Sequence, residues 1–248
     1  MKRCNQQNEP SRPANMKVFA HRGISALHPE NSQTALSHCN NAKMHGVEVD
    51  IFQVESEFYI VHDRWLTRTF NIDKKITELS TKEASKLLGR DGKPIPTLTW
   101  LIKEFAGKNL ELNLELKQVR DIDLFIEQLF QLCIESNFPI ELIIISSFNH
   151  QYLKAISEQQ PEVKIGLLMA NYPIDIGSTF HHFPIYSVHL DMDCISSELI
   201  QSIKQLGFPV YVFTVDQHSE IEWLHNNKVD GIFANNPENA YEIINKLI

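Results

Sequence analysis

Short apolar segments alternate with longer amphipathic segments from about residue 16 onward, and this alternation limits the possible folds more than any other feature. Nine segments have the length and composition of β-strands. They cover residues 17–20, 47–52, 58–61, 110–116, 142–146, 164–169, 185–190, 210–215 and 231–233. Helical patterns lie between most of these segments, the clearest at residues 31–44, 122–135, 195–206 and 219–226.

Eight strand–helix units and one hairpin partner predict an α/β fold of the (β/α)8 TIM-barrel type, and 248 residues is a typical length for it. No shift in composition marks a second domain, so we expect a single domain over residues 16–248. Residues 63–97 are irregular and predict a short insertion after the second strand region. Residues 1–15 predict a flexible N-terminal arm. A doubly wound parallel sheet is the alternative fold.

The composition excludes several classes of protein. No apolar run exceeds four residues, whereas a membrane span needs about 20, so we expect no stable membrane insertion. The net charge of −8 disfavours binding to nucleic acid or to anionic lipid surfaces. The four cysteines lie far apart without metal-binding spacing, as is usual in a reducing compartment. We therefore expect a soluble cytoplasmic protein, and the sequence leaves its oligomeric state open.

Polar side chains interrupt two of the predicted strands. Parallel barrel strands are covered on both faces, which favours nearly continuous apolar runs. In the first interrupted strand Glu48 and Asp50 share one face, and in the second Glu115 and Lys117 share a face with Glu111 and Asn113. An antiparallel strand with one solvated face is the alternative explanation. Inside a barrel, unpaired carboxylates would be costly unless a cation neutralised them.

Glu48, Asp50 and Glu115 offer only hard oxygen ligands. Such a set suits Mg²⁺ or Ca²⁺ better than zinc, whose sites usually include His or Cys. We therefore expect one divalent cation, Mg²⁺ or Ca²⁺, as the cofactor.

Two histidines and two basic side chains lie at the ends of predicted strands. His21 and His62 each directly follow a strand segment, and barrel enzymes place their catalytic groups at such ends. A pair of histidines can divide proton removal and proton donation between them. Arg22 and Lys117 would supply the local positive charge that a phosphoryl ligand needs in an acidic protein. Salt bridges at the barrel rim are the structural alternative for both.

An ordered set of short motifs runs through the chain. It comprises His21-Arg22-Gly23, Pro29-Glu30-Asn31-Ser32, Glu48-Val49-Asp50, His62-Asp63, Ile95-Pro96-Thr97-Leu98, Glu115-Leu116-Lys117, Ser147-Phe148 and Phe213-Thr214-Val215-Asp216. In order and spacing this set resembles the glycerophosphodiester phosphodiesterase family, which is related to the barrel phosphatidylinositol phospholipases C. The resemblance extends from about residue 17 to the C-terminus.

The resemblance implies a metal-dependent enzyme that hydrolyses small-molecule glycerophosphodiesters to glycerol 3-phosphate and an alcohol. It implies that the catalytic acid–base pair is His21 and His62, and that the metal ligands are Glu48, Asp50 and Glu115. It also implies that Arg22 and Lys117 contact the phosphate. Phe213 stands in place of a tryptophan and is expected to form an aromatic wall for the substrate.

Two motifs depart from the family pattern. Asp216 replaces the asparagine of Trp-Thr-Val-Asn, and Asn235 replaces the second aspartate of Asp-Gly-Ile-x-Thr-Asp-x-Pro. These changes leave open a catalytically silent barrel that binds a phosphodiester. A lysophospholipase D-like diesterase, which would act on lipid-bearing substrates under an apolar lid, is the further alternative.

Overall fold

The strands close into a barrel. In the computed structural model, which describes residues 16–248, the strands are β1 (Lys17–His21), β2 (Gly46–Val54), β3 (Glu57–Ile60), β4 (Glu111–Gln118), β5 (Ile143–Ser147), β6 (Lys164–Met169), β7 (Ser187–Asp191), β8 (Val210–Phe213) and β9 (Gly231–Ala234). Their order is β1-β9-β8-β7-β6-β5-β4-β2-β3, and a parallel β1–β2 pairing closes the ring. Eight parallel strands therefore form the barrel, while β3 pairs antiparallel with β2. This confirms the TIM-barrel prediction, and the closed ring excludes the doubly wound alternative.

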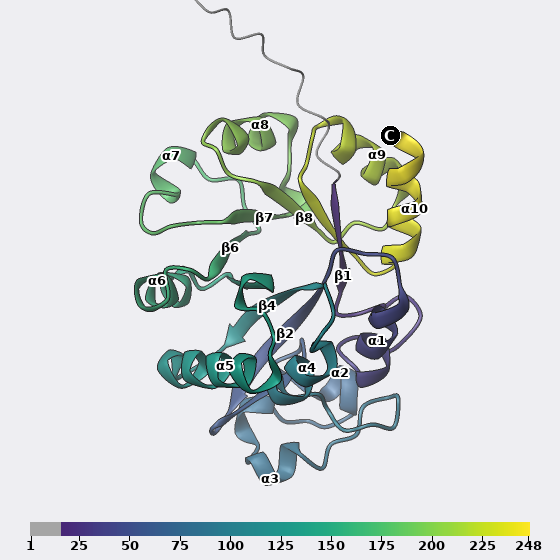
Figure 1. Cartoon of the computed structure of the whole chain (residues 1–248), viewed down its shortest axis with the longest axis vertical. Coiled ribbons are helices and arrows are strands. Elements are labelled where there is room, and N and C mark those ends of the chain that lie inside the picture. Colours follow the sequence, from purple (N-terminus) through teal and green to yellow (C-terminus); the bar gives the residue numbers. More distant parts are fainter. Residues whose placement is uncertain (1–15) are drawn as a thin grey trace, which may run out of the picture.

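Helices connect the parallel strands and cover the outside of the barrel (Figure 1). They are α1 (Gln33–His38) with η1 (Cys39–Asn41), α4 (Leu98–Phe105), α5 (Ile122–Ser136), η3 (Ile140–Leu142), α6 (His150–Gln159), α7 (Ile176–Thr179), η4 (Met192–Cys194), α8 (Ser197–Gln205), α9 (His218–Asn226) and α10 (Pro237–Leu247). The helix predicted at residues 31–44 is shorter than expected, because Ser32 caps it and Ala42 is already extended. Within residues 16–248, no helix combines the length and the apolar character that a membrane crossing requires.

Aromatic side chains fill part of the barrel interior. Phe19, Ile144, Tyr211 and Phe233 form a buried cluster of their own, separate from the larger core between strands and helices. The ring of Phe19 lies 5.2 Å from that of Phe233 and 5.6 Å from that of Tyr211. Gly46 makes room for Phe19, since a Cβ at this position would lie 2.5 Å from its ring. Side-chain alternation along the strands thus gives a packed interior below the polar site.

Polar residues on the inner face of β4 occupy different heights in the barrel. Glu111, at the start of β4, bonds Lys17 at 2.6 Å and Lys164 at 2.8 Å. These contacts lower the pKa of Glu111 even though its burial alone would raise it. Glu115, four residues further along β4, lies beside Asp50 of β2 in the parallel register and accepts a hydrogen bond from Lys117 at 2.6 Å. The inner face of β4, predicted from the sequence, therefore carries a stabilising ion cluster at the start of the strand and the candidate site further along it.

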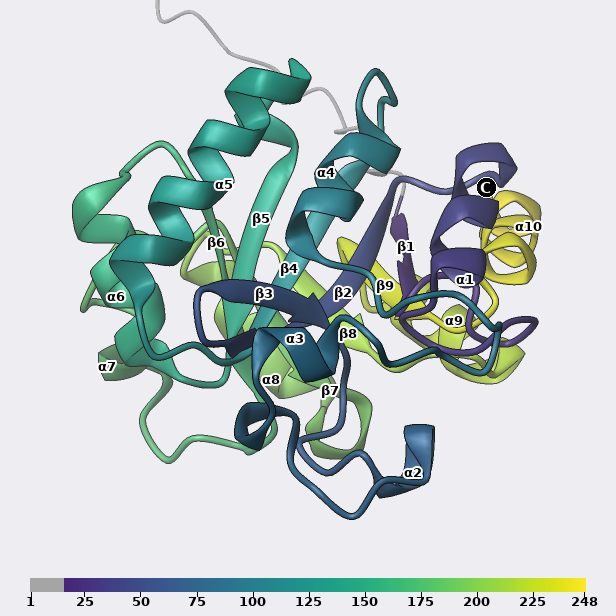
Figure 2. The ribbon, with the colours of Figure 1, turned by 90° about the horizontal axis from the view of Figure 1, so that it is seen from below.

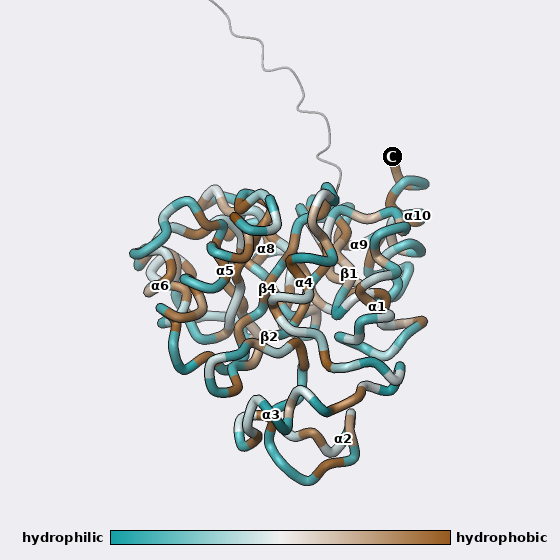
Figure 3. The backbone as a smooth tube through the Cα atoms, turned by 60° about the horizontal axis from the view of Figure 1, so that its bottom comes forward, coloured by the Kyte–Doolittle hydropathy of each residue, from teal (hydrophilic) through white to brown (hydrophobic). Residues whose placement is uncertain are grey.

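The segment after β3 packs as a small unit on the β2–β3 hairpin. It contains α2 (Thr67–Phe70), η2 (Ile76–Glu78) and α3 (Thr81–Ala84), and it projects from one end of the barrel (Figures 2 and 3). Its apolar side chains share a separate buried cluster with β2 and β3, made of Phe52, Val54, Tyr59, Val61, Leu66, Ile76, Leu79, Ala84 and Ile95. Strand residues thus complete a core that the segment alone would not supply.

Candidate active site

Three carboxylates converge at the carboxyl ends of β2 and β4. Glu48 and Asp50 lie on β2, and the parallel register places Asp50 beside Glu115 of β4. One oxygen atom from each of the three side chains lies within 4.8 Å of the others. Glu48 and Asp50 are almost completely buried. The cluster predicted from the spacing of these residues is therefore present.

The environment of this cluster disfavours its ionised form. Burial, together with repulsion from Asp50 and Glu115, raises the pKa of Glu48 well above its usual value. Burial and then Asp50 raise the pKa of Glu115 to about 7. Oε2 of Glu48 accepts the backbone N–H of Arg22 at 2.9 Å, but within residues 16–248 its Oε1 has no hydrogen-bond partner. A buried carboxylate oxygen without a donor, in a set of hard oxygen ligands, fits a divalent cation.

Two basic side chains flank the carboxylates. The Nε atom of Arg22 lies 3.4 Å from Asp50, and the Nζ atom of Lys117 lies 2.6 Å from Glu115 and 3.4 Å from Asp50. Arg22 has a φ of 58° and is followed by Gly23, where a Cβ would approach the backbone of Ala35 to 2.8 Å. This tight turn directs the Arg22 backbone N–H at Glu48. Both basic residues line the cleft predicted to receive the phosphate.

Both histidines line the same cleft, which has a volume of about 400 Å³. His21 ends β1, and burial followed by the charge of Arg22 lowers its pKa to about 4. His62 follows β3, which is the hairpin partner that the sequence predicts. The strand before it, β3, is antiparallel and turns back along β2, so that the N–H of Val61 donates to the carbonyl of Asp50 at 3.0 Å.

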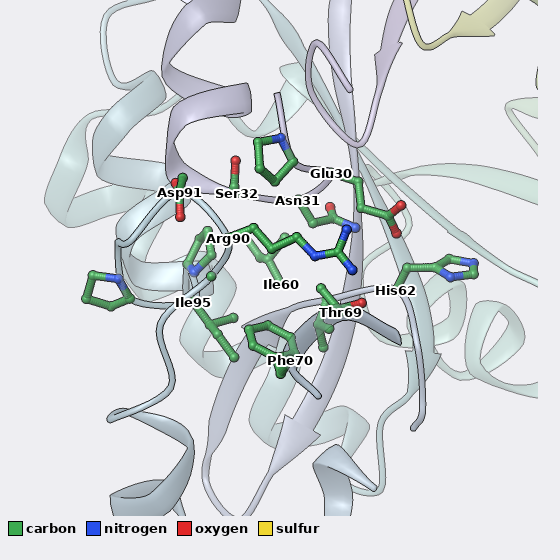
Figure 4. Close-up of a pocket in the computed structure, with 15 residues that line it drawn as sticks. Glu30, Asn31, Ser32, Ile60, His62, Thr69, Phe70, Arg90, Asp91 and Ile95 are labelled. Atoms are coloured by element: carbon green, nitrogen blue, oxygen red, sulfur yellow. The ribbon is translucent and has the colours of Figure 1, made fainter. Parts of the chain in front are cut away.

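Asp63 holds His62 and belongs to a network of charges. Its Oδ1 accepts a hydrogen bond from Nδ1 of His62 at 2.8 Å, and its Oδ2 accepts one from Arg68 at 2.6 Å. These bonds outweigh the effect of burial and lower the pKa of Asp63 to about 2. Arg68 also donates to Glu30 at 2.6 and 3.0 Å. Glu30 and His62 border a small pocket, across which the Arg90 side chain extends between Asn31 and Thr69 (Figure 4).

Aromatic side chains form one wall of the cleft. Phe213 and Phe148 both line it, with ring centres 6.0 Å apart in an edge-to-face arrangement. Phe148 is 46% exposed, and the Nζ atom of Lys117 lies 5.8 Å from its ring. The predicted aromatic wall therefore faces the space beside the carboxylates.

Sequence reasoning missed several residues that support the site. Asn31 lies at the start of the predicted helical segment 31–44, and its side chain donates to Asp50 at 2.8 Å. His189 was not singled out, although it is fully buried beneath the carboxylates and burial lowers its pKa to about 3. Asp216 and Asn235, which depart from the family pattern, contact each other, and Asn235 also contacts His21. The motifs single out Asn31, Asp216 and Asn235, but their contacts join distant parts of the chain and could not be predicted from it.

A closed barrel with a polar cleft at the carboxyl ends of its strands defines the class of TIM-barrel enzymes. The match to the glycerophosphoryl diester phosphodiesterase family covers residues 21–239. The chain therefore belongs to this family of phosphoric diester hydrolases, which confirms the resemblance found in its motifs.

Known proteins support this placement over nearly the whole chain. A glycerophosphodiester phosphodiesterase of Caldanaerobacter subterraneus subsp. tengcongensis is 30% identical, covering 92% of this chain and 98% of that protein. A phosphodiesterase of Oleispira antarctica, solved in complex with the product sn-glycerol-3-phosphate, has a TM-score of 0.84 and 26% identity, covering 92% of this chain and 96% of that one. A glycerophosphodiester phosphodiesterase from Parabacteroides distasonis shares the fold at 22% identity and a TM-score of 0.78, covering 94% of this chain and 98% of that one.

Proposed function

We propose that this chain hydrolyses glycerophosphodiesters to glycerol 3-phosphate and an alcohol, with a divalent cation as cofactor and with His21 and His62 as its acid–base pair. The observation that carries the proposal is the meeting of Glu48, Asp50 and Glu115 within 4.8 Å, at a cleft that both histidines line. The substrate class follows the family and its named members.

The side chains of the cleft divide the reaction between them. Arg22 and Lys117 hold the phosphoryl oxygens, and Phe213 packs against the glycerol. A nucleophilic hydroxyl, from water or from the 2-position of the glycerol, attacks phosphorus as the bond to the alcohol oxygen breaks. Attack by water gives glycerol 3-phosphate directly, whereas attack by the 2-hydroxyl gives a cyclic phosphate that water then opens to glycerol 3-phosphate. One histidine takes the proton of the nucleophile, and the other gives a proton to the departing oxygen. Both histidines thus need a defined ring nitrogen free for transfer.

Glu48, Asp50 and Glu115 would hold the cation, and Mg²⁺ or Ca²⁺ suits their oxygen atoms. A bound divalent cation supplies Lewis-acid polarisation and neutralises charge that develops on the phosphoryl group.

We keep the cytoplasm as the proposed location. Cys39 and Cys133 are buried free thiols, and burial raises the pKa of Cys39 to about 12, so these groups are unreactive packing residues.

The two alternatives fit the described residues less well. A silent barrel would have no need for a buried carboxylate cluster beside two histidines, since burial makes such a cluster costly. A diesterase for lipid-bearing substrates needs an apolar lid, for which the segment after β3 offers Trp65, Leu66 and Phe70. Leu66 is completely buried and Phe70 packs in the same cluster, which leaves only Trp65 exposed.

Release of glycerol 3-phosphate from glycerophosphocholine tests the proposal. We expect turnover with Mg²⁺ or Ca²⁺, none with chelator, and a fall in kcat of about 10²- to 10⁴-fold for His21→Ala and for His62→Ala. His218→Ala is the matched control, because His218 is exposed on α9 and bonds Glu222 there. Binding of the diester without turnover in either metal would favour the silent barrel. Activity confined to a lipid-bearing diester would favour the other alternative.

A further inference from the structure

A row of hydrogen bonds joins His21 to Asp216 through the side chain of Asn235. Nδ1 of His21 lies 2.9 Å from Oδ1 of Asn235. On the other side of the amide, Nδ2 of Asn235 donates to Asp216 at 2.6 Å, and the backbone N–H of Asn235 donates to the second oxygen of Asp216 at 2.8 Å. The three residues come from the end of β1 and from the segments that follow β9 and β8.

The carboxylate fixes the direction of every bond in this row. An ionised carboxylate only accepts hydrogen bonds, so the amide of Asn235 must turn its NH₂ group to Asp216 and its oxygen to His21. An amide oxygen also only accepts, so Nδ1 of His21 must carry the proton. In the neutral ring, Nε2 is then the unprotonated nitrogen.

The surroundings agree with this direction. Asp216 is half-buried, and it lines a groove of about 490 Å³ together with Asn235. The hydroxyl of Ser25 lies 2.7 Å from Oδ1 of Asn235 and 2.8 Å from the carbonyl of His21, both of which accept. Thr214 offers a second oxygen 3.5 Å from Nδ1 of His21. Oδ1 of Asn235 and the hydroxyl of Thr214 can therefore both accept a hydrogen bond from Nδ1.

We propose that Asn235 and Asp216 are positioning residues that hold His21 as the Nδ1–H tautomer and leave Nε2 as the proton acceptor in the cleft. The catalytic meaning of that acceptor rests on the proposed function, but the tautomer is a property of the protein alone. Relative to the family pattern, the aspartate and the asparagine have exchanged positions 216 and 235. Position 235 still offers His21 a hydrogen-bond acceptor.

Nitrogen NMR of the histidine rings tests the tautomer directly. In the protein labelled with ¹⁵N-histidine, with the His21 signals assigned by His21→Gln, we expect a proton on Nδ1 and none on Nε2 at neutral pH. A proton on Nε2 would overturn the proposal. This measurement needs no substrate, so it decides the proposal even where no diester is hydrolysed, an outcome that would count against the proposed function alone.

Kinetics of three variants test the positioning role. For Asp216→Asn and for Asn235→Asp we expect kcat to fall about 10- to 100-fold with little change in KM, as for other groups that orient a functional histidine. The first change releases the amide, and the second sets two carboxylates against each other. The double exchange restores an oriented acceptor, so we expect its kcat to return to within about threefold of the original.

Asn239→Asp is the control, because it adds a carboxylate in the same groove without touching His21. We expect it to keep full activity, and melting temperatures report whether each variant is folded. A double exchange no more active than the weaker single variant, in folded protein, would contradict positioning. A rise in KM at constant kcat in the single variants would also contradict positioning.

Discussion

At the scale of single residues, the candidate site is defined by carboxylates that the fold buries close to one another, where their ionised forms are unfavourable. Glu48 is buried, faces two other carboxylates and lacks a donor for one of its oxygens among residues 16–248. Arg22 and Lys117 offset part of this repulsion through Asp50 and Glu115. A cation bound by the three carboxylates would offset the rest, which couples cation binding to folding stability.

Glu48→Gln separates the cost of burying the Glu48 carboxylate from its part in binding a cation. Its amide oxygen can keep the bond from the Arg22 N–H, while its NH₂ group becomes a donor for the neighbouring carboxylates. In chelator at neutral pH we expect the variant to be more stable than the original by roughly 1–3 kcal/mol, because buried Glu48 must either carry a charge beside two carboxylates or take up a proton, and the amide does neither. Urea unfolding measures the difference. We also expect the variant to lose its response to Mg²⁺, and an equal Mg²⁺ response in both proteins would exclude Glu48 as a ligand.

The stabilisation by Mg²⁺ should depend on pH. The pKa of Glu115 is about 7 in the folded state against an ordinary 4.5, so the metal-free fold holds a proton that the unfolded chain releases. That contribution, ~1.4 kcal/mol for each unit of separation, is complete below the ordinary pKa and is lost as the pH rises through about 7. A cation replaces the proton, so we expect the Mg²⁺-induced rise in Tm to be small near pH 5 and to reach its maximum above pH 7.

Calorimetry with chelator and with saturating Mg²⁺ gives this difference at each pH. Buried His21 and His189 have lowered pKa values and shift stability in the opposite direction, but they do so in both series. A Mg²⁺-induced rise that is constant from pH 5 to pH 8 would contradict protonation of the cluster.

The sequence predicts the chemical groups of the site better than their connections. Alternation along the strands places Glu48, Asp50 and Glu115 correctly, because strand periodicity directly determines which side chains share a face. The pairing of Asp216 with Asn235 could not be predicted in this way. It joins loops whose separation in space depends on closure of the whole barrel.

At the scale of elements, the segment after β3 is tied to the site by charge. Arg68 of α2 bonds Asp63, which holds His62, and it also bonds Glu30, which in turn accepts from Arg22. At its other end, Asp91 accepts the N–H of Thr34 at the start of α1. The segment thus supports one histidine and one basic residue of the cleft.

Arg68→Ala should affect catalysis more than stability. The Arg68 side chain is 53% exposed, and exposed ion pairs contribute at most about 1 kcal/mol. Asp63 loses a partner, however, so we expect kcat/KM to fall about tenfold through poorer orientation of His62. Lys74→Ala is the matched control, because Lys74 pairs with Glu83 on the same segment, where both are exposed. Equal kcat/KM values for the two variants would show that the network has no catalytic role.

All nine strands of residues 16–248 lie within two residues of their predicted limits, since apolar runs and turn residues mark them in the sequence. The predicted hairpin partner is β3. The shortening of α1 was not predicted, because it depends on what the segment packs against, and the local sequence pattern does not contain that information.

At the scale of the whole molecule, stability depends on the filled barrel interior. Phe19 on β1 packs against Tyr211 and Phe233 from β8 and β9, so one cluster joins the beginning and the end of the domain. Its ring is completely buried. Removal of this ring leaves a cavity that rigid strands cannot close.

Phe19→Ala should therefore destabilise the protein by about 3–5 kcal/mol, measured by equilibrium unfolding in urea. Tyr172→Ala is the comparison, because Tyr172 is 52% exposed and its truncation should cost less than about 0.5 kcal/mol. Similar values for the two variants would mean that the interior tolerates the loss of its central ring.

Pairing of β1 with β9 has a further consequence for biosynthesis. His21 and its partner Asn235 are 214 positions apart, and they meet only when the final strand is inserted between its neighbours. A ribosome-bound polypeptide that still lacks this strand carries Glu48, Asp50, Glu115, His21 and His62, but His21 does not yet have its contact with Asn235. We therefore expect the complete arrangement around His21 to form only at the end of translation.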